Sequence, residues 1–350
     1  MSGPAMPKDA IDYWEFFAAE ARRTGSELYG RLADGVAQNE ALRAIAARAR
    51  KGQPHANLLF GAVHFLLLRG ASHPLRAFYP DLNDGPAAAG DPFPAFCDFV
   101  AANRAEIERL VAARVTNTNE VGRSALLHPG FQSLAAEMAG TPLNLIEIGP
   151  SAGLNLIWDH YGVRYCQNGV ERAAIQPGAP LVIDCELRGD SLPPTGPVPN
   201  VRRRLGLELN PVDLSNDDDR DWLRALIWPD QVSRLQRLDR AIELFRGQAP
   251  EIRQGDGLAL LPAALRAMPE DEPVCVYHTI ALYQFSREMR QTLDDILTMA
   301  GVRRPVWRLS FEAEDTTRYV LSLIRYHDGV REERVLASAH PHGSWMEWLA

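Results

Sequence analysis

The sequence predicts an α/β protein in which a doubly wound sheet follows an all-α N-terminal domain. Apolar residues recur at helical spacing up to about residue 140, and this stretch carries no strand pattern. Residues 143–155 then have the pattern of a buried strand, a glycine-rich turn and a helix. Further on, apolar strands alternate with amphipathic helices, and an antiparallel hairpin follows them. We therefore expect a helical domain over residues 1–140 and a sheet domain over 141–350.

A polar run joins the two predicted domains. Residues 116–124 are rich in Thr, Asn and Ser, and a helix is expected after them, over residues 131–139. Such residues favour helix caps, which is the simpler interpretation. The alternative is a ligand-facing loop that supplies Asn119, Glu120 and Arg123 to a site beside the glycine-rich turn.

The glycine-rich turn fits two different chemistries. Glu147, Gly149 and Gly153 form the Glu-x-Gly-x-x-x-Gly pattern that is the first motif of class I S-adenosylmethionine-dependent methyltransferases. Residues 149–153 also read Gly-x-Ser-x-Gly, the nucleophile elbow of α/β-hydrolases, with Ser151 as the nucleophile. In either case the helix expected over residues 154–161 presents its N-terminus to a polar or anionic ligand.

The elements after the turn are expected in a regular order. Residues 164–199 form an insertion: an irregular stretch over 164–180, a short strand over 181–187 and a proline-rich loop over 189–199. The later strands are expected at residues 203–213, 251–254, 273–280 and 305–312, with helices at 215–228, 231–245, 258–267 and 286–299. Asp328 and Gly329 then mark the tight turn of a hairpin between residues 318–326 and 330–338.

This order favours the methyltransferase fold. An α/β-hydrolase places several strands before its nucleophile elbow, whereas only helices precede this turn. Glu208 ends the second predicted strand, where an acid accepts hydrogen bonds from ribose hydroxyls, and the insertion accounts for its distance from Gly153. Asp256 resembles the acid that contacts adenine after the third strand. We therefore expect a class I methyltransferase (Rossmann-like) sheet with a C-terminal antiparallel hairpin.

Five motifs together resemble a bacterial family, that of domain of unknown function 2332. They are Thr-Asn-Glu-Val-Gly-Arg at residues 118–123, Glu-Ile-Gly-x-Ser-Ala-Gly-Leu-Asn-Leu at 147–156, Leu-Asn-Pro after an acid at 208–211, a histidine at 278, and His-Pro-His-Gly-x-Trp-x-Glu-Trp at 340–348. Glu208 stands where the family usually has Asp. The resemblance implies a methyltransferase-like fold and makes residues 118–123 a site element.

From these patterns we predict an S-adenosylmethionine-dependent methyltransferase of an unidentified small molecule. The cofactor-binding residues are expected to be Glu147, Gly149, Ser151, Gly153, Asn155, Glu208, Asn210 and Asp256. The substrate-binding residues are expected to be Asn119, Glu120, Arg123, Tyr283, His340 and His342. A serine hydrolase that uses Ser151 and a methyltransferase-like protein that binds a ligand without catalysis are the alternatives.

Two further expectations concern histidines. His278 ends the central strand, where it could act as a general base or be a hydrogen-bonded core residue. His340 and His342 form a His-x-His pair, but no cluster of Cys, Asp or Glu accompanies them, so no metal site is expected. The C-terminal residues Trp345 and Trp348 are expected to dock on the core.

Composition limits the remaining function classes. With 45 acidic and 37 basic residues the formal net charge is −8, which disfavours a general nucleic-acid binder. We expect no membrane segment and no secretory signal, and hence a cytoplasmic protein. The four cysteines form no Cys-x-x-Cys pair, which argues against disulfides and zinc.

Overall fold

A computed structural model describes residues 10–138, 141–248, 250–270, 272–315 and 317–350. The chain divides into two units, and each is built from two separate stretches. The helical unit comprises Met1–Thr118 and Val212–Leu238, and the sheet unit comprises Asn119–Pro211 and Asp239–Ala350. The sequence suggested instead a division at residue 140.

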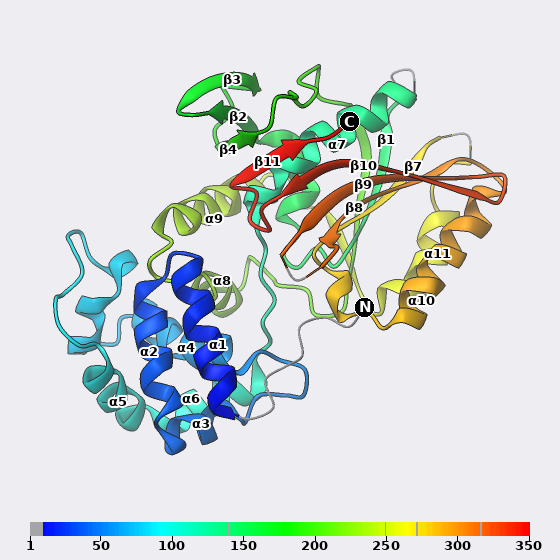
Figure 1. Cartoon of the computed structure of the whole chain (residues 1–350). Coiled ribbons are helices and arrows are strands. Elements are labelled where there is room, and N and C mark those ends of the chain that lie inside the picture. The colour runs from blue at the N-terminus through cyan, green and yellow to red at the C-terminus, as the bar shows by residue number, and fades with distance from the viewer. Residues whose placement is uncertain (1–9, 139–140, 249, 271, 316) are drawn as a thin grey trace. The chain divides into compact units, whose positions relative to one another are not determined.

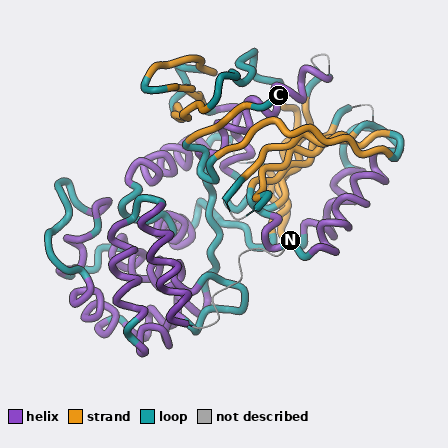
Figure 2. Tube along the Cα trace, viewed as in Figure 1, coloured by secondary structure: helices purple, strands orange, loops and turns teal. Residues whose placement is uncertain are grey.

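In the helical unit every regular element among the described residues is a helix (Figure 2). These elements are α1 (Ala10–Arg23), α2 (Glu27–Ala37), α3 (Glu40–Ala46), α4 (His55–Leu68), the 3-10 helices η1 (Pro74–Phe78) and η2 (Pro80–Leu82), α5 (Phe93–Ala102), α6 (Arg104–Ala113) and α8 (Asp217–Ala225). Helix α9 (Val232–Phe245) begins in this unit and ends in the sheet unit.

Helix α4 is the centre of the helical unit, because it is apolar on nearly all sides and its residues from Leu58 to Phe65 are buried. Helix α8 joins the same core from a distant part of the sequence through Trp222 and Ala225. In the first turn of α8, the Asp219 carboxylate forms an ion pair with Arg114 at 2.5 Å. An amphipathic pattern shows that α8 must bury a face, but it does not show against which unit.

The sheet unit contains one mixed sheet of eleven strands, in the order β3-β2-β4-β11-β10-β9-β8-β7-β1-β5-β6 (Figure 1). The strands are β1 (Leu143–Ile148), β2 (Gly162–Gln167), β3 (Val170–Ile175), β4 (Val182–Arg188), β5 (Val201–Glu208), β6 (Glu251–Gln254), β7 (Val274–Thr279), β8 (Val306–Ala313), β9 (Tyr319–His327), β10 (Val330–Ala339) and β11 (Trp345–Trp348). Strands β6, β5, β1, β7 and β8 run parallel, and β9 and β10 continue the sheet antiparallel.

Helices cover both faces of the parallel strands. Helices α10 (Gly257–Arg266) and α11 (Arg287–Gly301) pack on one face against Ile146, Leu207 and Val276. The other face carries α7 (Ser124–Glu137) and the 3-10 helix η4 (Leu154–His160). Because side chains alternate along a strand, neighbouring residues of β1, β5 and β7 point to opposite helix layers. This alternation decides which polar side chains can meet.

Proline in α7 explains one long-range contact. Pro129 lies inside the helix and has no N–H, so the carbonyl of Ala125 loses its helical donor. The hydroxyl of Tyr165, on β2, donates to that carbonyl at 2.7 Å. The buried backbone oxygen is thus satisfied by a side chain from the sheet.

Several predicted elements are confirmed. The helical N-terminal region, strand β1 and the later strands β5 to β8 are present. The hairpin of β9 and β10 turns at Asp328 and Gly329, whose φ angles are 50° and 75°. The protein is therefore a mixed α/β protein with a helical N-terminal region and a large mixed sheet.

One local prediction is wrong, and the structure specifies two others more closely. Residues 164–180 are not irregular, since β2 and β3 form a hairpin there with Asn168 and Gly169 at its turn. The helix expected over residues 154–161 is present as a 3-10 helix over residues 154–160. The C-terminal tryptophans belong to strand β11, which pairs with β10 and with β4 and so joins the insertion to the main sheet.

Candidate functional site

The turn after β1 needs glycine at two positions. Gly149 and Gly153 have φ angles of 73° and 83°, and Ser151 between them also has a positive φ, 57°. A Cβ on Gly149 would lie 2.9 Å from the Cβ of Ala281, and one on Gly153 would lie 2.9 Å from Ile252. The turn therefore packs tightly on the loops that follow β7 and on β6.

Glu208 holds this turn from the end of β5. Its Oε2 accepts a hydrogen bond from the backbone N–H of Ser151 at 2.8 Å, and its Oε1 accepts one from Asn210 at 3.0 Å. The backbone N–H of Gly255 donates to the carbonyl of Glu208 at 2.9 Å. Each carboxylate oxygen can accept a second bond, so this bridge leaves Glu208 able to bind a hydroxyl group.

The loop before α7 is anchored to the same turn. The Oδ1 of Asn119 accepts the backbone N–H of Leu154 at 2.9 Å, which caps η4. The carbonyl of Glu120 accepts the side-chain amide of Asn155 at 3.3 Å. Asn119 and Glu120 are both buried. The structure thus brings together the expected residues 119–120 and the turn, with the loop as a structural support of it.

Arg123 connects two further segments. This residue ends the 3-10 helix η3 (Val121–Arg123). Its Nε donates to the carbonyl of Pro341 at 2.8 Å, and its Nη1 donates to that of Thr279 at 2.7 Å. Gly343 then approaches η3 so closely that a Cβ there would lie 2.1 Å from the carbonyl oxygen of Gly122. The C-terminal residues 340–343 are therefore held beside the carboxyl end of β7.

Glu147 and Tyr277 meet on the face of the sheet that η4 covers. The Oη of Tyr277 lies 3.0 Å from Oε2 of Glu147 and 3.1 Å from the carbonyl oxygen of Asn155. Glu147 is only 1% exposed, and burial raises the pKa of its carboxyl group to about 8. Burial also raises the pKa of Tyr277. Glu147 is thus an acid that can be neutral at physiological pH.

His278 points to the opposite face. It follows Tyr277 on β7, and Val276, two residues earlier, packs with α10 and α11. The Nδ1 of His278 lies 2.7 Å from Oε1 of Glu312, which also accepts the backbone N–H groups of Ala281 and Leu282. Burial lowers the pKa of His278, which is completely buried. In this position His278 is a packed core histidine, separated by the sheet from Glu147.

The backbone beyond His278 is strained. Ile280 has a φ of 53°, which is rare for a β-branched residue. Its N–H donates to the carbonyl of Phe311 at 2.7 Å, and Glu312 holds the next two N–H groups. Burial raises the pKa of Glu312, but the hydrogen bonds from His278 and the backbone outweigh it and lower that pKa overall. Glu312 therefore accepts these bonds as a carboxylate.

The remaining expected site residues lie at the ends of separate strands. Asn210 and Asp256 are exposed after β5 and β6, and Asp256 caps α10 by accepting the N–H of Leu258 at 2.8 Å. Tyr283 is 62% exposed in the 3-10 helix η5 (Leu282–Gln284) after β7. The rings of His340 and His342 lie 5.2 Å apart and are half-buried.

Glu312 was not predicted as a site residue, and no role was predicted for the Tyr277 hydroxyl. Glu312, like Glu147 and Glu208, is an acidic residue near the end of an apolar strand. That shared position was a usable signal. The role of the Tyr277 hydroxyl had no such signal, because it depends on which face of β7 meets η4.

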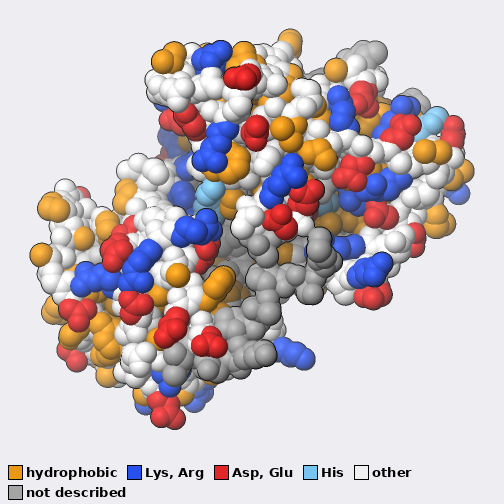
Figure 3. Space-filling view, viewed as in Figure 1, with side chains coloured by type: hydrophobic (Ala, Val, Ile, Leu, Met, Phe, Trp, Pro, Cys, Tyr) orange, Lys and Arg blue, Asp and Glu red, His pale blue; other side chains and the backbone are white. Residues whose placement is uncertain are grey.

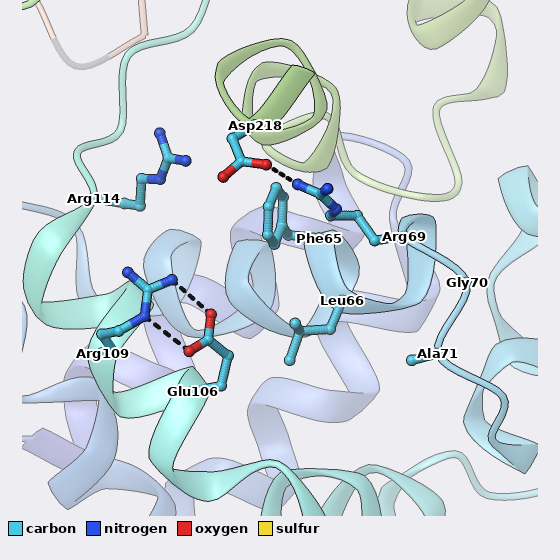
Figure 4. A pocket seen from close by; sticks show the side chains of 9 residues that line it. All are labelled: Phe65, Leu66, Arg69, Gly70, Ala71, Glu106, Arg109, Arg114 and Asp218. Atoms are coloured by element: carbon cyan, nitrogen blue, oxygen red, sulfur yellow. Dashed lines mark hydrogen bonds and ion pairs between the residues drawn. The ribbon is translucent and has the colours of Figure 1, made fainter. Parts of the chain in front are cut away.

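The described part of the chain was also searched for metal-ligand clusters, membrane-spanning helices and pockets. No three His, Cys, Asp or Glu side chains gather there as metal ligands. None of the helices found in it has the length and apolar character needed to cross a membrane. A hollow of about 450 Å³ lies in the helical unit beside Phe65. Around it Arg109 pairs with Glu106 and Arg69 pairs with Asp218, so these arginines are already neutralised (Figure 4).

Comparison with known proteins identifies a family. Neither the curated proteins nor the solved structures contain a match to this chain. A family model does match, over residues 12–348, which is nearly the whole sequence. The chain belongs to the family described as uncharacterized protein conserved in bacteria (DUF2332).

Proposed function

We propose that this protein is an S-adenosylmethionine-dependent methyltransferase of a small molecule. The order of its parallel strands carries the proposal. Numbered along the chain as first to fifth, β1, β5, β6, β7 and β8 lie side by side in the order 3-2-1-4-5. This is the order of doubly wound nucleotide-binding sheets, in which the ligand lies outside the carboxyl ends of the strands where the order reverses. Here the order reverses between β1 and β7.

The groups at this edge suit an adenosine ligand that also carries a positive charge. The glycine turn after β1 brings backbone close to the ligand, and Glu208 offers carboxylate oxygens toward ribose hydroxyls. Glu147 and Glu208 add acidic character beside the turn. Asn210, Asp256 and Tyr283 would border the cofactor and the methyl acceptor.

A small-molecule acceptor is preferred to a nucleic acid. The protein carries a formal net charge of −8. On the face shown in Figure 3, acidic and basic side chains are interspersed over the surface. A phosphate backbone needs a continuous basic track. We also propose a cytoplasmic location, which the four free cysteines support.

The proposal is tested by calorimetric titration with S-adenosylmethionine and S-adenosylhomocysteine. Saturable binding is expected, and Asp256→Ala should weaken it. Asn216→Ala is the matched control, since Asn216 caps α8 in the helical unit just as Asp256 caps α10. Both variants lose about 1 kcal/mol of capping energy. If the folded protein binds neither ligand, the proposal is wrong.

A serine hydrolase is the second candidate, because Ser151 has the positive φ that a nucleophile elbow requires. An elbow, however, presents its Oγ at the top of the sheet, whereas Ser151 is only 2% exposed. Esterase activity that disappears in Ser151→Ala would favour this candidate. Binding of the cofactor without any methylated product would instead favour a non-catalytic ligand-binding protein.

A further inference from the structure

The two hydrogen-bond contacts of the Tyr277 hydroxyl bear on the protonation state of Glu147. The Tyr277 oxygen lies within hydrogen-bond distance of two groups, the Glu147 carboxyl and the carbonyl of Asn155. A carbonyl and an ionised carboxylate can only accept, and the tyrosine hydroxyl has a single hydrogen to donate. With Glu147 ionised, one of these two buried contacts therefore has no hydrogen. With Glu147 protonated, its O–H donates to Tyr277, which in turn donates to Asn155, and both contacts are satisfied.

The surroundings of Glu147 agree with a neutral acid. The charged or titratable groups facing it are Tyr277 from β7, Glu208 from β5, Arg123 from η3 and Tyr161 after η4, while Arg204 of β5 acts on Tyr277. Phe131 of α7 covers the Tyr277 ring with an apolar surface. Burial is the main effect that disfavours the ionised form, and Glu208 adds to it, whereas the Tyr277 hydrogen bond and Arg123 oppose it.

We infer that Glu147 is a neutral acid in the free protein and ionises when a positively charged ligand occupies the glycine turn, so that binding releases a proton. Glu147 and Glu208 end neighbouring strands that flank the turn, with Glu147 opposite Gly206 in the register. Two close carboxyl groups resist ionising together, and a cation next to them removes that resistance. The O–H bond of Glu147 breaks, its proton passes to the solvent, and the Tyr277 hydroxyl then donates to the carboxylate.

This inference rests on the proposed function, because it takes the sulfonium or the amino group of S-adenosylmethionine as the cation. The test is calorimetric titration with S-adenosylmethionine at neutral pH in phosphate and in Tris, which differ in ionisation enthalpy. The difference in observed heat gives the number of protons released. Wild type should release close to one proton per ligand, and Glu147→Gln should release none.

Two comparisons sharpen the test. Glu332→Gln, which removes an exposed acid of β10, should release as many protons as wild type. S-adenosylhomocysteine lacks the sulfonium charge, so a smaller release with it identifies the sulfonium as the coupled cation, and an equal release identifies the amino group. Both results support the inference.

The inference and the proposed function fail in different ways. Ligand binding with the same heat in both buffers would overturn the coupling and leave the proposed function intact. No binding by either ligand would overturn both. The neutral acid has its own readout, an infrared band of a protonated carboxyl group at neutral pH that is lost in Glu147→Gln. Absence of that band in wild type would overturn the inference whatever the ligands do.

Discussion

Replacing Gly343 by alanine tests whether the C-terminal turn is held against η3. Gly343 has a φ of 71°, and a Cβ there would lie 2.1 Å from the oxygen and 2.5 Å from the carbon of the Gly122 carbonyl. These are backbone atoms, so no side-chain rotation can relieve the overlap. Residues 340–343 would have to move away from η3, and the hydrogen bond from Arg123 to Pro341 would be lost with them.

The expected loss of stability can be separated into two parts. Alanine at a left-handed position costs about 1 kcal/mol in itself. The overlap with Gly122 adds about 1 to 3 kcal/mol, the usual cost of overpacking. Gly329→Ala is the matched control, because Gly329 has a φ of 75° and nothing lies within 4 Å of its added Cβ. Gly343→Ala should therefore lower the free energy of unfolding by about 2 to 4 kcal/mol, and Gly329→Ala by about 1 kcal/mol.

Urea unfolding followed by circular dichroism measures this difference. Hydrogen exchange then locates it, since residues 119–123 should exchange faster in Gly343→Ala and at the wild-type rate in Gly329→Ala. The reasoning is refuted if the two variants lose equal stability and exchange alike. That result would mean that residues 340–343 do not pack on η3.

Three further predictions concern buried polar groups. Tyr165→Phe should lower the free energy of unfolding by about 1 to 3 kcal/mol, because it leaves the Ala125 carbonyl buried without a donor. The control is Tyr79→Phe, which removes a buried hydroxyl that has no partner among the described residues. It should leave the free energy of unfolding nearly unchanged in the same urea experiment. The folded pKa of Glu147, about 8, exceeds its ordinary 4.5, so its contribution to stability is lost as the pH rises between these values. As the pH rises from about 4.5 to about 8, the free energy of unfolding of Glu147→Gln should therefore increase relative to that of wild type by on the order of 3 to 5 kcal/mol. A stability difference between the two proteins that does not change with pH would contradict this prediction. Burial lowers the pKa of His128 from 6.5 to about 4, so the contribution of the neutral imidazole to stability is lost as the pH falls through this range. His128→Gln should therefore lose less stability than wild type over the same range, by on the order of 3 kcal/mol. Equal acid sensitivity of the two proteins would contradict this prediction.

The sequence by itself determined the elements whose signals are local. The hairpin turn at Asp328 and Gly329 and the glycine turn of residues 149–153 were predictable, because each needs positive φ angles that few residues adopt. The β2–β3 hairpin carries the same kind of signal at Asn168 and Gly169, and it could have been found from it. The acids at the ends of β1 and β5 were also visible as charges beside apolar runs.

Only the tertiary structure decided which distant segments meet. Strand β11 pairs with β4, and helix α8 joins the core of the helical unit, although in both cases the partner is far away in the sequence. Pairing and packing of this kind depend on the whole chain, because an apolar pattern predicts that a face is buried but does not identify the element that buries it.

The same reason applies within the candidate site. Tyr277 and His278 are adjacent on β7, and the sequence favoured His278 as the functional residue. The pleat of the strand sends them to opposite faces, so that Tyr277 meets Glu147 and Asn155 while His278 is packed with Glu312. Residue types and spacing determined the edge of the sheet where the candidate site was expected. The face that each side chain occupies was set by the register of the sheet and by the helix layer that covers it.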